Sequence, residues 1–395
     1  MKKLVLIAIL VATMSAPVYS QAPRDGTFGS DLSFLQKHKQ VVVLRSEDDD
    51  CQVAVVPDYQ GRVMTSTANG PAGSSYGWIN YDLIASGTWV EHINVLGGED
   101  RFWMGPEGGQ FSIFFKNGVD FTFENWFTPA AIDTEPFEVV NHDQTRVSFR
   151  KQIQLENYSE ASFEIEVSRD ISLLQRSVIE SNLGIKLDPN TKSVGFQSVN
   201  DLKNTGPAAW KKESGLLSIW ILGMFKPSDQ TSIVIPYKDD LKLNSGYFGE
   251  VPKDRLMTTD NAVVFKGDGK YRSKIGLPPQ NIVPVCGSYD AENSVLTIVQ
   301  YTFGGDVDYV NSFWGLQDEP FAGDVVNSYN DGPLEDGSQL GPFYELESSS
   351  SAKALQPHQS IRHTHRTYHF EGSRDELEKI ATNVLGVSLS EVAFP

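Results

Sequence analysis

Two glutamates near the C-terminal end, Glu345 and Glu347, could carry out acid–base chemistry. They lie in the segment GPFYELESSS at positions 341–350. Alternate residues of a β-strand point to the same side, so both carboxylates would share one face, with Leu346 on the other. Two acids in an otherwise apolar run are costly unless that face is wet or functional. The pair therefore indicates either a solvated sheet face or a site.

A glycine-rich segment, GGEDRFWMGPEGG at 97–109, is the second candidate. Glycines allow the backbone to approach a ligand closely, while Arg101 offers a hydrogen-bonding fork and Trp103 an apolar stacking face. Sugars need this combination, because each ring has apolar C–H patches beside hydroxyl groups. The alternative is a glycine-rich hairpin that surrounds a core tryptophan.

Three polar side chains in SVNDLKNTGPAAW, at 198–210, form the third candidate: Asn200, Asp201 and Asn204 precede a Gly-Pro break. Asn and Asp side chains often satisfy the backbone of a turn by themselves. Turn chemistry and ligand contact both remain open for this segment.

Histidines alternate in IRHTHRTYHF, at 361–370, which places His363, His365 and His369 on one face of a strand. This spacing is compatible with metal binding or with acid–base work near neutral pH. A polar ladder on a solvated strand is the simpler explanation. Because no compact carboxylate or cysteine group adjoins the histidines, we expect neither a metal nor a cofactor.

Charge restricts the partners of the chain. It has 51 Asp and Glu against 33 Lys and Arg, a formal net charge of −18. The acids are spread along the sequence, so most are expected to be solvated surface. Nucleic acid and anionic membrane surfaces are poor partners for such a chain.

The first 20 residues have the pattern of a signal peptide. Lys2 and Lys3 precede an apolar run at 4–14, and Val18 to Ser20 provide a cleavage site. The run is shorter than the roughly 20 apolar residues that a membrane span requires. We therefore expect a mature protein that begins near Gln21, does not insert into a membrane, and works in the periplasm or outside the cell.

Short alternating segments predict a β-rich fold. Strands are expected at 111–115, 121–123, 163–167, 194–197, 295–301 and 361–370. The 33 Gly and 20 Pro between them favour antiparallel sheets joined by turns. No linker divides the chain, so residues 21–395 are predicted to form a single domain.

Two helices are expected as well. Ser30 would cap a short helix that ends at Gln36, and a capping box of Ser373 and Glu376 would open a helix at 373–386. The cysteines, Cys51 and Cys286, could form one disulfide in an exported protein or remain as two buried thiols. Neither has a spacing that suggests catalysis.

Together these segments resemble the galactose mutarotase-like superfamily, which includes the aldose 1-epimerases. Leu-Glu-Ser at 346–348, followed by ALQPHQSIRHTHRTYHF at 354–370, is similar to the family's Leu-Glu-Thr strand, its turn and its closing Tyr-x-Phe strand. His358 occupies the position where that turn usually has Gly. QVAVVPDYQGRVMTST at 52–67 is similar to the opening strands. Order and spacing agree over most of the mature chain.

The resemblance implies an all-β fold, a large antiparallel β-supersandwich with a short C-terminal helix and a sugar bound in its concave face. In the enzymes a Glu removes the proton of the anomeric hydroxyl and a His protonates the ring oxygen. Glu347 matches that Glu. If Asn204 is aligned with the last Asn of the family's Thr-Asn-His-Ser-Tyr-Phe-Asn segment, Asn200 occupies the position of the His. His92, five residues before Gly97, corresponds loosely to the family's other histidine.

The sequence thus predicts a carbohydrate-active protein whose partner is a mono- or oligosaccharide. An epimerase would use Glu347 as base and His365 or His92 as acid, with Arg101, Trp103, Asn200, Asp201, Asn204 and Glu345 as substrate contacts. A binding protein without catalysis would keep the contacts and need no acid. A purely structural exported sandwich would leave the glycine-rich segment without a role.

Overall fold

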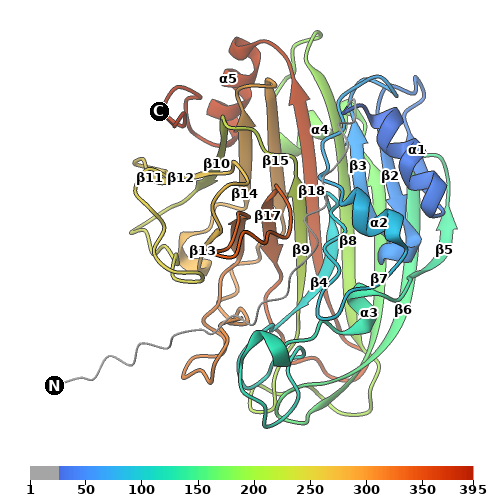
Figure 1. The fold of residues 1–395 in the computed structure, drawn as a ribbon, viewed down its shortest axis with the longest axis vertical. Coiled ribbons are helices and arrows are strands. Elements are labelled where there is room, and N and C mark those ends of the chain that lie inside the picture. Colours follow the sequence, from blue (N-terminus) through green and yellow to red (C-terminus); the bar gives the residue numbers. More distant parts are fainter. Residues whose placement is uncertain (1–25, 395) are drawn as a thin grey trace.

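The computed structural model describes residues 26–394, which form three antiparallel sheets. Figure 1 shows the largest of them running across the molecule behind a smaller sheet. In spatial order, the ten-stranded sheet contains β11 (Leu256–Thr258), β12 (Ala262–Lys266), β10 (Thr231–Pro236), β14 (Val285–Asp290), β15 (Val295–Tyr301), β18 (Ser360–Glu371), β8 (Lys192–Asn204), β7 (Ser162–Leu173), β6 (Arg146–Glu156) and β5 (Glu138–His142). The five-stranded sheet contains β13 (Ser273–Leu277), β16 (Val326–Asn330), β17 (Tyr344–Ser349), β9 (Ser218–Phe225) and β4 (Arg101–Gly105). The three-stranded sheet contains β1 (Val42–Arg45), β2 (Gln52–Val56) and β3 (Arg62–Thr67).

An apolar layer joins the five-stranded sheet to the ten-stranded sheet. Leu346 of β17 and Phe225 of β9 point inward and pack with Cys286 and Val299 of the larger sheet. The next residues along β17, Glu345 and Glu347, point to the other side because side chains alternate along a strand. The five-stranded sheet therefore has an apolar inner face and a polar outer face.

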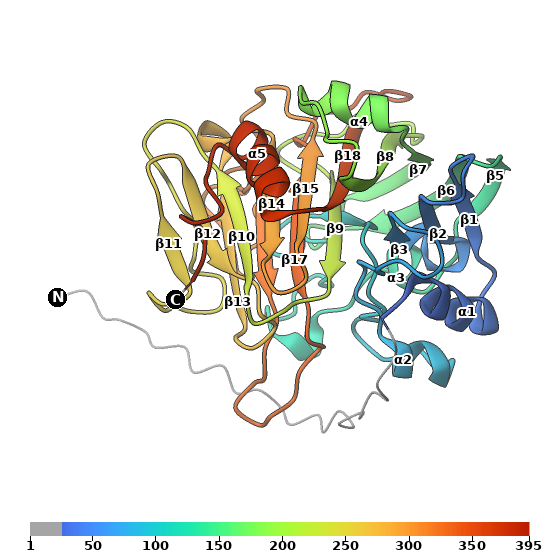
Figure 2. The ribbon, with the colours of Figure 1, turned by 90° about the horizontal axis from the view of Figure 1, so that it is seen from above.

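Helices cover the opposite face of the ten-stranded sheet, as Figure 2 shows for α4 (Arg176–Leu183) and α5 (Arg374–Val384). Leu377 and Ile380 of α5 pack on Leu296 of β15 and Phe370 of β18. The predicted capping box of Ser373 and Glu376 is present at the start of α5. The C-terminal helix is thus confirmed, and it docks against the sheet.

The remaining helices accompany the three-stranded sheet and the loops. They are α1 (Phe28–His38), α2 (Tyr81–Ser86) and α3 (Ala130–Asp133). Helix α1 begins earlier than the sequence indicated, because the side chain of Thr27, and not that of Ser30, accepts the capping hydrogen bond. Its buried Phe28 and Leu35 pack on Ala54 and Met64 of the small sheet.

Strand β18 lies between β15 and β8 in the middle of the ten-stranded sheet (Figure 1). It pairs with β8 along its whole length, from Ser360 opposite Lys203 to Glu371 opposite Lys192. The turn that leads into β18 contains His358 at φ 68°. This left-handed conformation favours glycine, which explains the Gly that resembling sequences carry there.

The predicted strands at 163–167, 194–197, 295–301 and 361–370 lie within β7, β8, β15 and β18. Those at 111–115 and 121–123 are wrong, because the first segment is loop and turn and the second leads into a short 3-10 helix at Phe123–Asn125. Their apolar side chains serve a cluster of aromatic rings instead. Phe114, for example, stacks on Trp126 with ring centroids 5.6 Å apart.

The two cysteines are free thiols. Cys51 contacts the backbone oxygen of Ser193, and Cys286 lies in the core between the large sheets. No helix among residues 26–394 is long and apolar enough to cross a membrane. The predicted signal peptide, residues 1–20, lies outside the described residues.

Candidate functional site on the five-stranded sheet

The outer face of the five-stranded sheet brings together charged and aromatic side chains from four of its strands. Register places Arg101 of β4 opposite Leu222 of β9, and Leu222 opposite Glu347 of β17. Lys274 of β13 stands opposite Tyr329, which in turn stands opposite Glu345. We call this surface the carboxylate face; its members are Arg101, Trp103, Trp220, Lys274, Glu345 and Glu347.

Glu347 is the most firmly held group on the carboxylate face. Its Oε2 accepts hydrogen bonds from the Trp220 indole at 2.9 Å and from Lys274 Nζ at 2.9 Å. The carboxylate is fully buried, and its Oε1 has no hydrogen-bond partner among the described residues. One oxygen is thus fixed while the other is left to accept a proton or a ligand hydroxyl.

Lys274 is the positively charged neighbour of the carboxylates on this face. Its ammonium lies 4.7 Å from the centroid of the Trp220 ring. Burial opposes its charge, but the carboxylates of Glu347, Glu345 and Glu107 outweigh burial and raise the pKa of Lys274 above its usual value. The lysine is therefore a cation at neutral pH, and Glu347 has a permanent counter-ion.

Glu345 has a different environment from Glu347. No hydrogen bond to its carboxyl group occurs among residues 26–394, and the residue is 6% exposed. Burial and then the charge of Glu347 raise the pKa of Glu345 well above its usual range, although Lys274 and Arg101 act in the opposite direction. Two carboxyl groups with environments this different can take different roles in one reaction.

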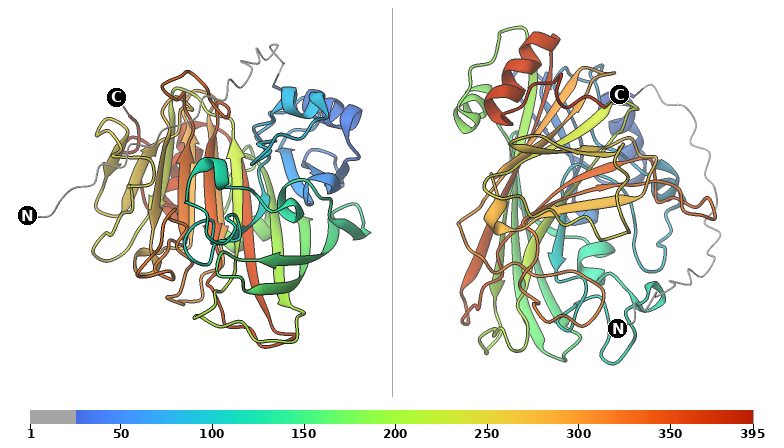
Figure 3. Two further views of the ribbon diagram at one scale, coloured as in Figure 1. Left: turned by 60° about the horizontal axis from the view of Figure 1, so that its bottom comes forward. Right: turned by 90° about the vertical axis from the view of Figure 1, so that its left-hand side faces the viewer.

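A third carboxyl group, Glu107, reaches the carboxylate face from the loop after β4. Its Oε1 accepts a hydrogen bond from the Trp314 indole at 3.0 Å. Burial raises the pKa of Glu107, while Lys274 and Trp314 lower it. Further bonds join the two loops: the Gln110 side chain donates to the backbone oxygen of Gln317 and accepts from its backbone N–H. The loops 106–128 and 303–323 thus meet beside the site (Figure 3).

Arg101 and Trp103, predicted to contact a sugar, lie on the carboxylate face but are engaged with the protein. Arg101 donates to Asp133 at 2.8 Å, and its guanidinium lies 4.0 Å from the Trp103 ring centroid. Trp103 is 3% exposed and also packs on Phe114. The Trp103 indole is therefore packed between the Arg101 guanidinium and the Phe114 ring, and its faces are covered by the protein.

The glycines of the segment 97–109 bring protein backbones together. A side chain at Gly97, which has φ 90°, would lie 2.1 Å from the carbonyl oxygen of Trp78. One at Gly108 would lie 2.3 Å from the carbonyl oxygen of Phe313. The close approach predicted from these glycines exists, and the partner at both positions is the chain itself.

The polar residues of β8 lie away from the carboxylate face. Asn200 is buried between the sheets and accepts a hydrogen bond from Arg169 at 2.6 Å. Asp201 points to the other side of β8 and forms an ion pair with Arg362 at 2.8 Å. Asn204 supports a turn, since its side chain bonds the backbone of Gly206 at 3.0 Å. The structure does not bring these three residues together with Glu347.

The histidines of β18 point into the layer between the sheets. Ser348 Oγ lies 2.7 Å from His363 Nε2 and 2.8 Å from His365 Nδ1. Burial lowers the pKa of His363 to about 3 and that of His365 to about 4. Ser348 points away from the carboxylate face, so both rings lie on the inner side of β17. No group of three or more His, Cys, Asp and Glu residues suited to a metal occurs within 26–394.

His92 lies in a separate loop. Its Nδ1 is 2.7 Å from the carbonyl oxygen of Trp126. Its ring packs between Phe123 and Phe127 with centroid distances of 4.6 and 4.5 Å. Both phenylalanines are more than 40% exposed, so His92 belongs to an aromatic patch at the surface.

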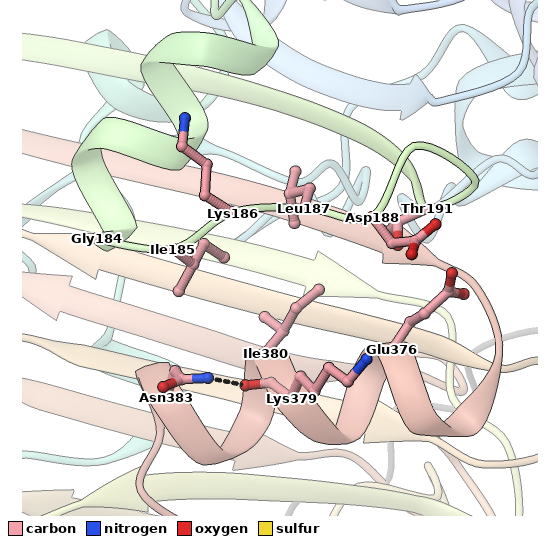
Figure 4. A pocket seen from close by; sticks show the side chains of 10 residues that line it. All are labelled: Gly184, Ile185, Lys186, Leu187, Asp188, Thr191, Glu376, Lys379, Ile380 and Asn383. Carbon is pink, nitrogen blue, oxygen red and sulfur yellow. Dashed lines mark hydrogen bonds between the residues drawn. The ribbon is translucent and has the colours of Figure 1, made fainter.

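One cavity of the fold lies elsewhere and has no comparable chemistry. It has a volume of about 270 Å³ and lies between the segment after α4 and helix α5 (Figure 4). Two of its charged groups are engaged by the protein: Lys186 pairs with Glu180, and Glu376 caps α5. The carboxylate face is therefore the candidate functional site.

The sequence patterns did not single out Lys274 and Trp220 of the carboxylate face, nor Glu107 and Trp314 beside it. Glu107 lies in the glycine-rich segment 97–109, where a carboxylate among glycines could have been recognised as a candidate site residue. Lys274 and Trp220 are single residues in ordinary strands. Only the pairing of β13, β16, β17 and β9 brings them to Glu347.

The fold is that of galactose mutarotase-like proteins. The structure is similar to the Slr1438 protein from Synechocystis sp. PCC 6803, with a TM-score of 0.52 at 12% identity over 85% of this chain and 96% of that one. It is also similar to a candidate aldose 1-epimerase from Escherichia coli K12, with a TM-score of 0.50 at 11% identity over 85% of this chain and 99% of that one. A galactose mutarotase-like protein from Lactobacillus casei ATCC 334 matches with a TM-score of 0.45 at 9% identity, over 84% of this chain and 100% of that one.

The chain itself belongs to a family described as "Family of unknown function (DUF6786)", which matches residues 26–394. No curated protein matches the sequence. At such low identity the solved structures establish the fold alone, so function must be argued from the site.

Proposed function

We propose that this is an exported carbohydrate-active protein that binds a mono- or oligosaccharide on the carboxylate face and interconverts its anomers, as an aldose 1-epimerase does. The observation that carries the proposal is the pair Glu345 and Glu347 beside Lys274 and Trp220. Carboxylates, an ammonium and an indole supply the hydrogen bonds and apolar contact that a sugar ring requires. The fold supports the choice of ligand, since structures of this type include a candidate aldose 1-epimerase.

Glu347 is the base in this proposal. Oε1 is the oxygen that carries no hydrogen bond among the described residues, whereas Oε2 is fixed by Trp220 and Lys274. A carboxylate held in one orientation can take the proton of the anomeric hydroxyl without first reorganising. Lys274 is the cation that faces Glu347 in the resting site.

A second candidate function, sugar binding without catalysis, is favoured by the burial of Glu347. The carboxylate is fully buried, and its ion pair with Lys274 resembles a structural bridge. In that case Glu345, which is 6% exposed, and not Glu347 meets the ligand. Such a protein would be stabilised by a sugar and would leave its anomers unchanged.

The two functions are separated by measuring binding and anomer exchange on the same samples. Thermal-shift assays with α-D-glucose, α-D-galactose and short oligosaccharides should show stabilisation by at least one of them. Polarimetry or NMR exchange should then show faster interconversion of that sugar's anomers. The variant Glu347→Gln should retain binding and lose roughly two to four orders of magnitude in rate.

Glu166→Gln is the matched control, because Glu166 lies on β7, at the solvated side of the ten-stranded sheet, where it contacts Gln152 and Arg150 at the surface. It should behave as wild type. Wild-type protein that binds a sugar but leaves anomer exchange at the uncatalysed rate would contradict the epimerase function and support the binding protein. Mass spectrometry of protein from the periplasm or medium would test export, with a mature chain that starts near Gln21 as the expected result.

A further inference from the structure

Ring opening of a sugar requires a proton donor as well as a base, and the histidines of this chain are poorly placed to donate. Asn200, at the position of the family histidine, is bonded to Arg169 between the sheets. His365 lies on the inner side of β17, where burial lowers its pKa to about 4. His92 is held in the aromatic patch by the backbone of Trp126.

Glu345 stands where a donor is needed. It is two residues from Glu347 on β17, so both side chains leave the strand on the same side. Unlike Glu347, it has no hydrogen bond to its carboxyl group among residues 26–394 and keeps contact with solvent. A carboxyl group without protein partners is free to donate to a ligand atom.

The charges that face Glu345 come from four directions. Glu347 lies on the same strand, Lys274 on β13, Arg101 on β4, and Asp331 directly after β16. Burial raises the pKa of Glu345 most, followed by Glu347, while Lys274 and Arg101 lower it and Asp331 raises it. The two acids thus differ: Glu347 is paired with a cation, whereas Glu345 favours its protonated form.

We propose that Glu345 is the proton donor to the ring oxygen and replaces the missing histidine, an inference that rests on the proposed anomer exchange. Glu347 takes the proton of the anomeric hydroxyl as Glu345 gives its proton to the ring oxygen. The bond between the anomeric carbon and the ring oxygen breaks, and an open-chain aldehyde forms. After the aldehyde group rotates, its oxygen regains the proton from Glu347 while the ring hydroxyl attacks and returns a proton to Glu345. No other reactant is consumed.

The experiment measures anomer exchange of α-D-glucose and α-D-galactose against pH for wild type, Glu345→Gln and Glu345→Asp. In wild type the rate should fall as pH rises through the pKa of Glu345, because the donor loses its proton. Glu345→Gln keeps the shape but cannot donate, so the rate should fall roughly 100- to 10,000-fold with sugar binding retained. Glu345→Asp should recover part of the rate together with the alkaline decline.

The outcomes separate this inference from the proposed function. If wild type exchanges neither sugar although it binds one, the proposed function and this inference both fail. If wild type exchanges a sugar and Glu345→Gln keeps its rate and alkaline decline, only the assignment of Glu345 fails. Circular dichroism shows whether each variant is folded, and the wild-type pH profile tests the donor even where a variant does not fold.

Discussion

Acid should destabilise this protein through the buried histidines of β18. His363 and His365 are 1% and 0% exposed and both contact Ser348 Oγ. Burial lowers the pKa of His363 to about 3, with the neighbouring His365 adding to the effect, and burial likewise lowers the pKa of His365 to about 4. In the unfolded chain each should titrate at its ordinary pKa of about 6.5.

The sign and size of the effect follow from this difference. Above pH 6.5 both states carry neutral rings, so the histidines cause no pH dependence. As pH falls from 6.5 towards 4, the unfolded chain binds protons that the folded protein cannot. Each ring then lowers the free energy of unfolding by about 1.4 kcal/mol per pH unit. At pH 5 the loss is about 2 kcal/mol for each histidine and about 4 kcal/mol for the two.

Urea unfolding at pH 7.5, 6 and 5 measures this loss when wild type is compared with His363→Gln, His365→Gln and the double variant. Carboxyl groups titrate equally in all four proteins, so the difference between them isolates the histidines. The double variant should be less stable than wild type at pH 7.5, because bonds to Ser348 change. That gap should close by about 4 kcal/mol at pH 5, and by half as much in each single variant. Parallel stability curves would refute the reasoning.

Three further results are expected. Lys274→Met should lower the free energy of unfolding by about 3 to 5 kcal/mol, because it leaves Glu347 buried without a counter-ion. Adding Glu347→Gln should restore the stability, and a double variant as unstable as Lys274→Met would contradict this explanation. Ser373→Ala should cost about 1 kcal/mol by removing the cap of α5, which urea unfolding would show, whereas an unchanged midpoint would speak against the capping box. Limited proteolysis of the mature protein should yield one core from about residue 30 to α5, and two stable fragments that divide near the middle would contradict a single domain.

Sequence patterns correctly predicted strands in which apolar and polar residues alternate, because the two faces of such a strand have different surroundings. The alternation at 361–370 identified β18, and that at 341–350 correctly placed Glu345 and Glu347 on one side of β17. The segments at 111–115 and 121–123 carry the same apolar signal but form loops. There the aromatic rings are buried against one another, as Phe115 is against Phe121. A loop with buried apolar side chains therefore has the same sequence pattern as a strand, although its backbone does not pair with a sheet.

Only part of the site could be predicted from the sequence, for a related reason. A pattern along one strand shows which side chains share a face, but it does not show which strands lie next to each other. Lys274 and Trp220 reach Glu347 through pairings between segments far apart in sequence. Asn200 was correctly expected in a polar run, yet its face of β8 meets Arg169 between the sheets. Whether Asn200 supports a turn, joins a buried hydrogen-bond network or contacts a ligand depends on the elements that pack against β8.

The central position of β18 also governs when the chain can fold. Its neighbours β15 and β8 begin about 65 and 168 residues earlier in the sequence, at Val295 and Lys192 against Ser360. Until β18 emerges from the ribosome, each of them presents an unpaired edge. The ten-stranded sheet therefore cannot close during synthesis, and nucleation must wait for contacts of high sequence separation, which makes folding slow. A truncation before β18 would leave the edges of β15 and β8 exposed to aggregation.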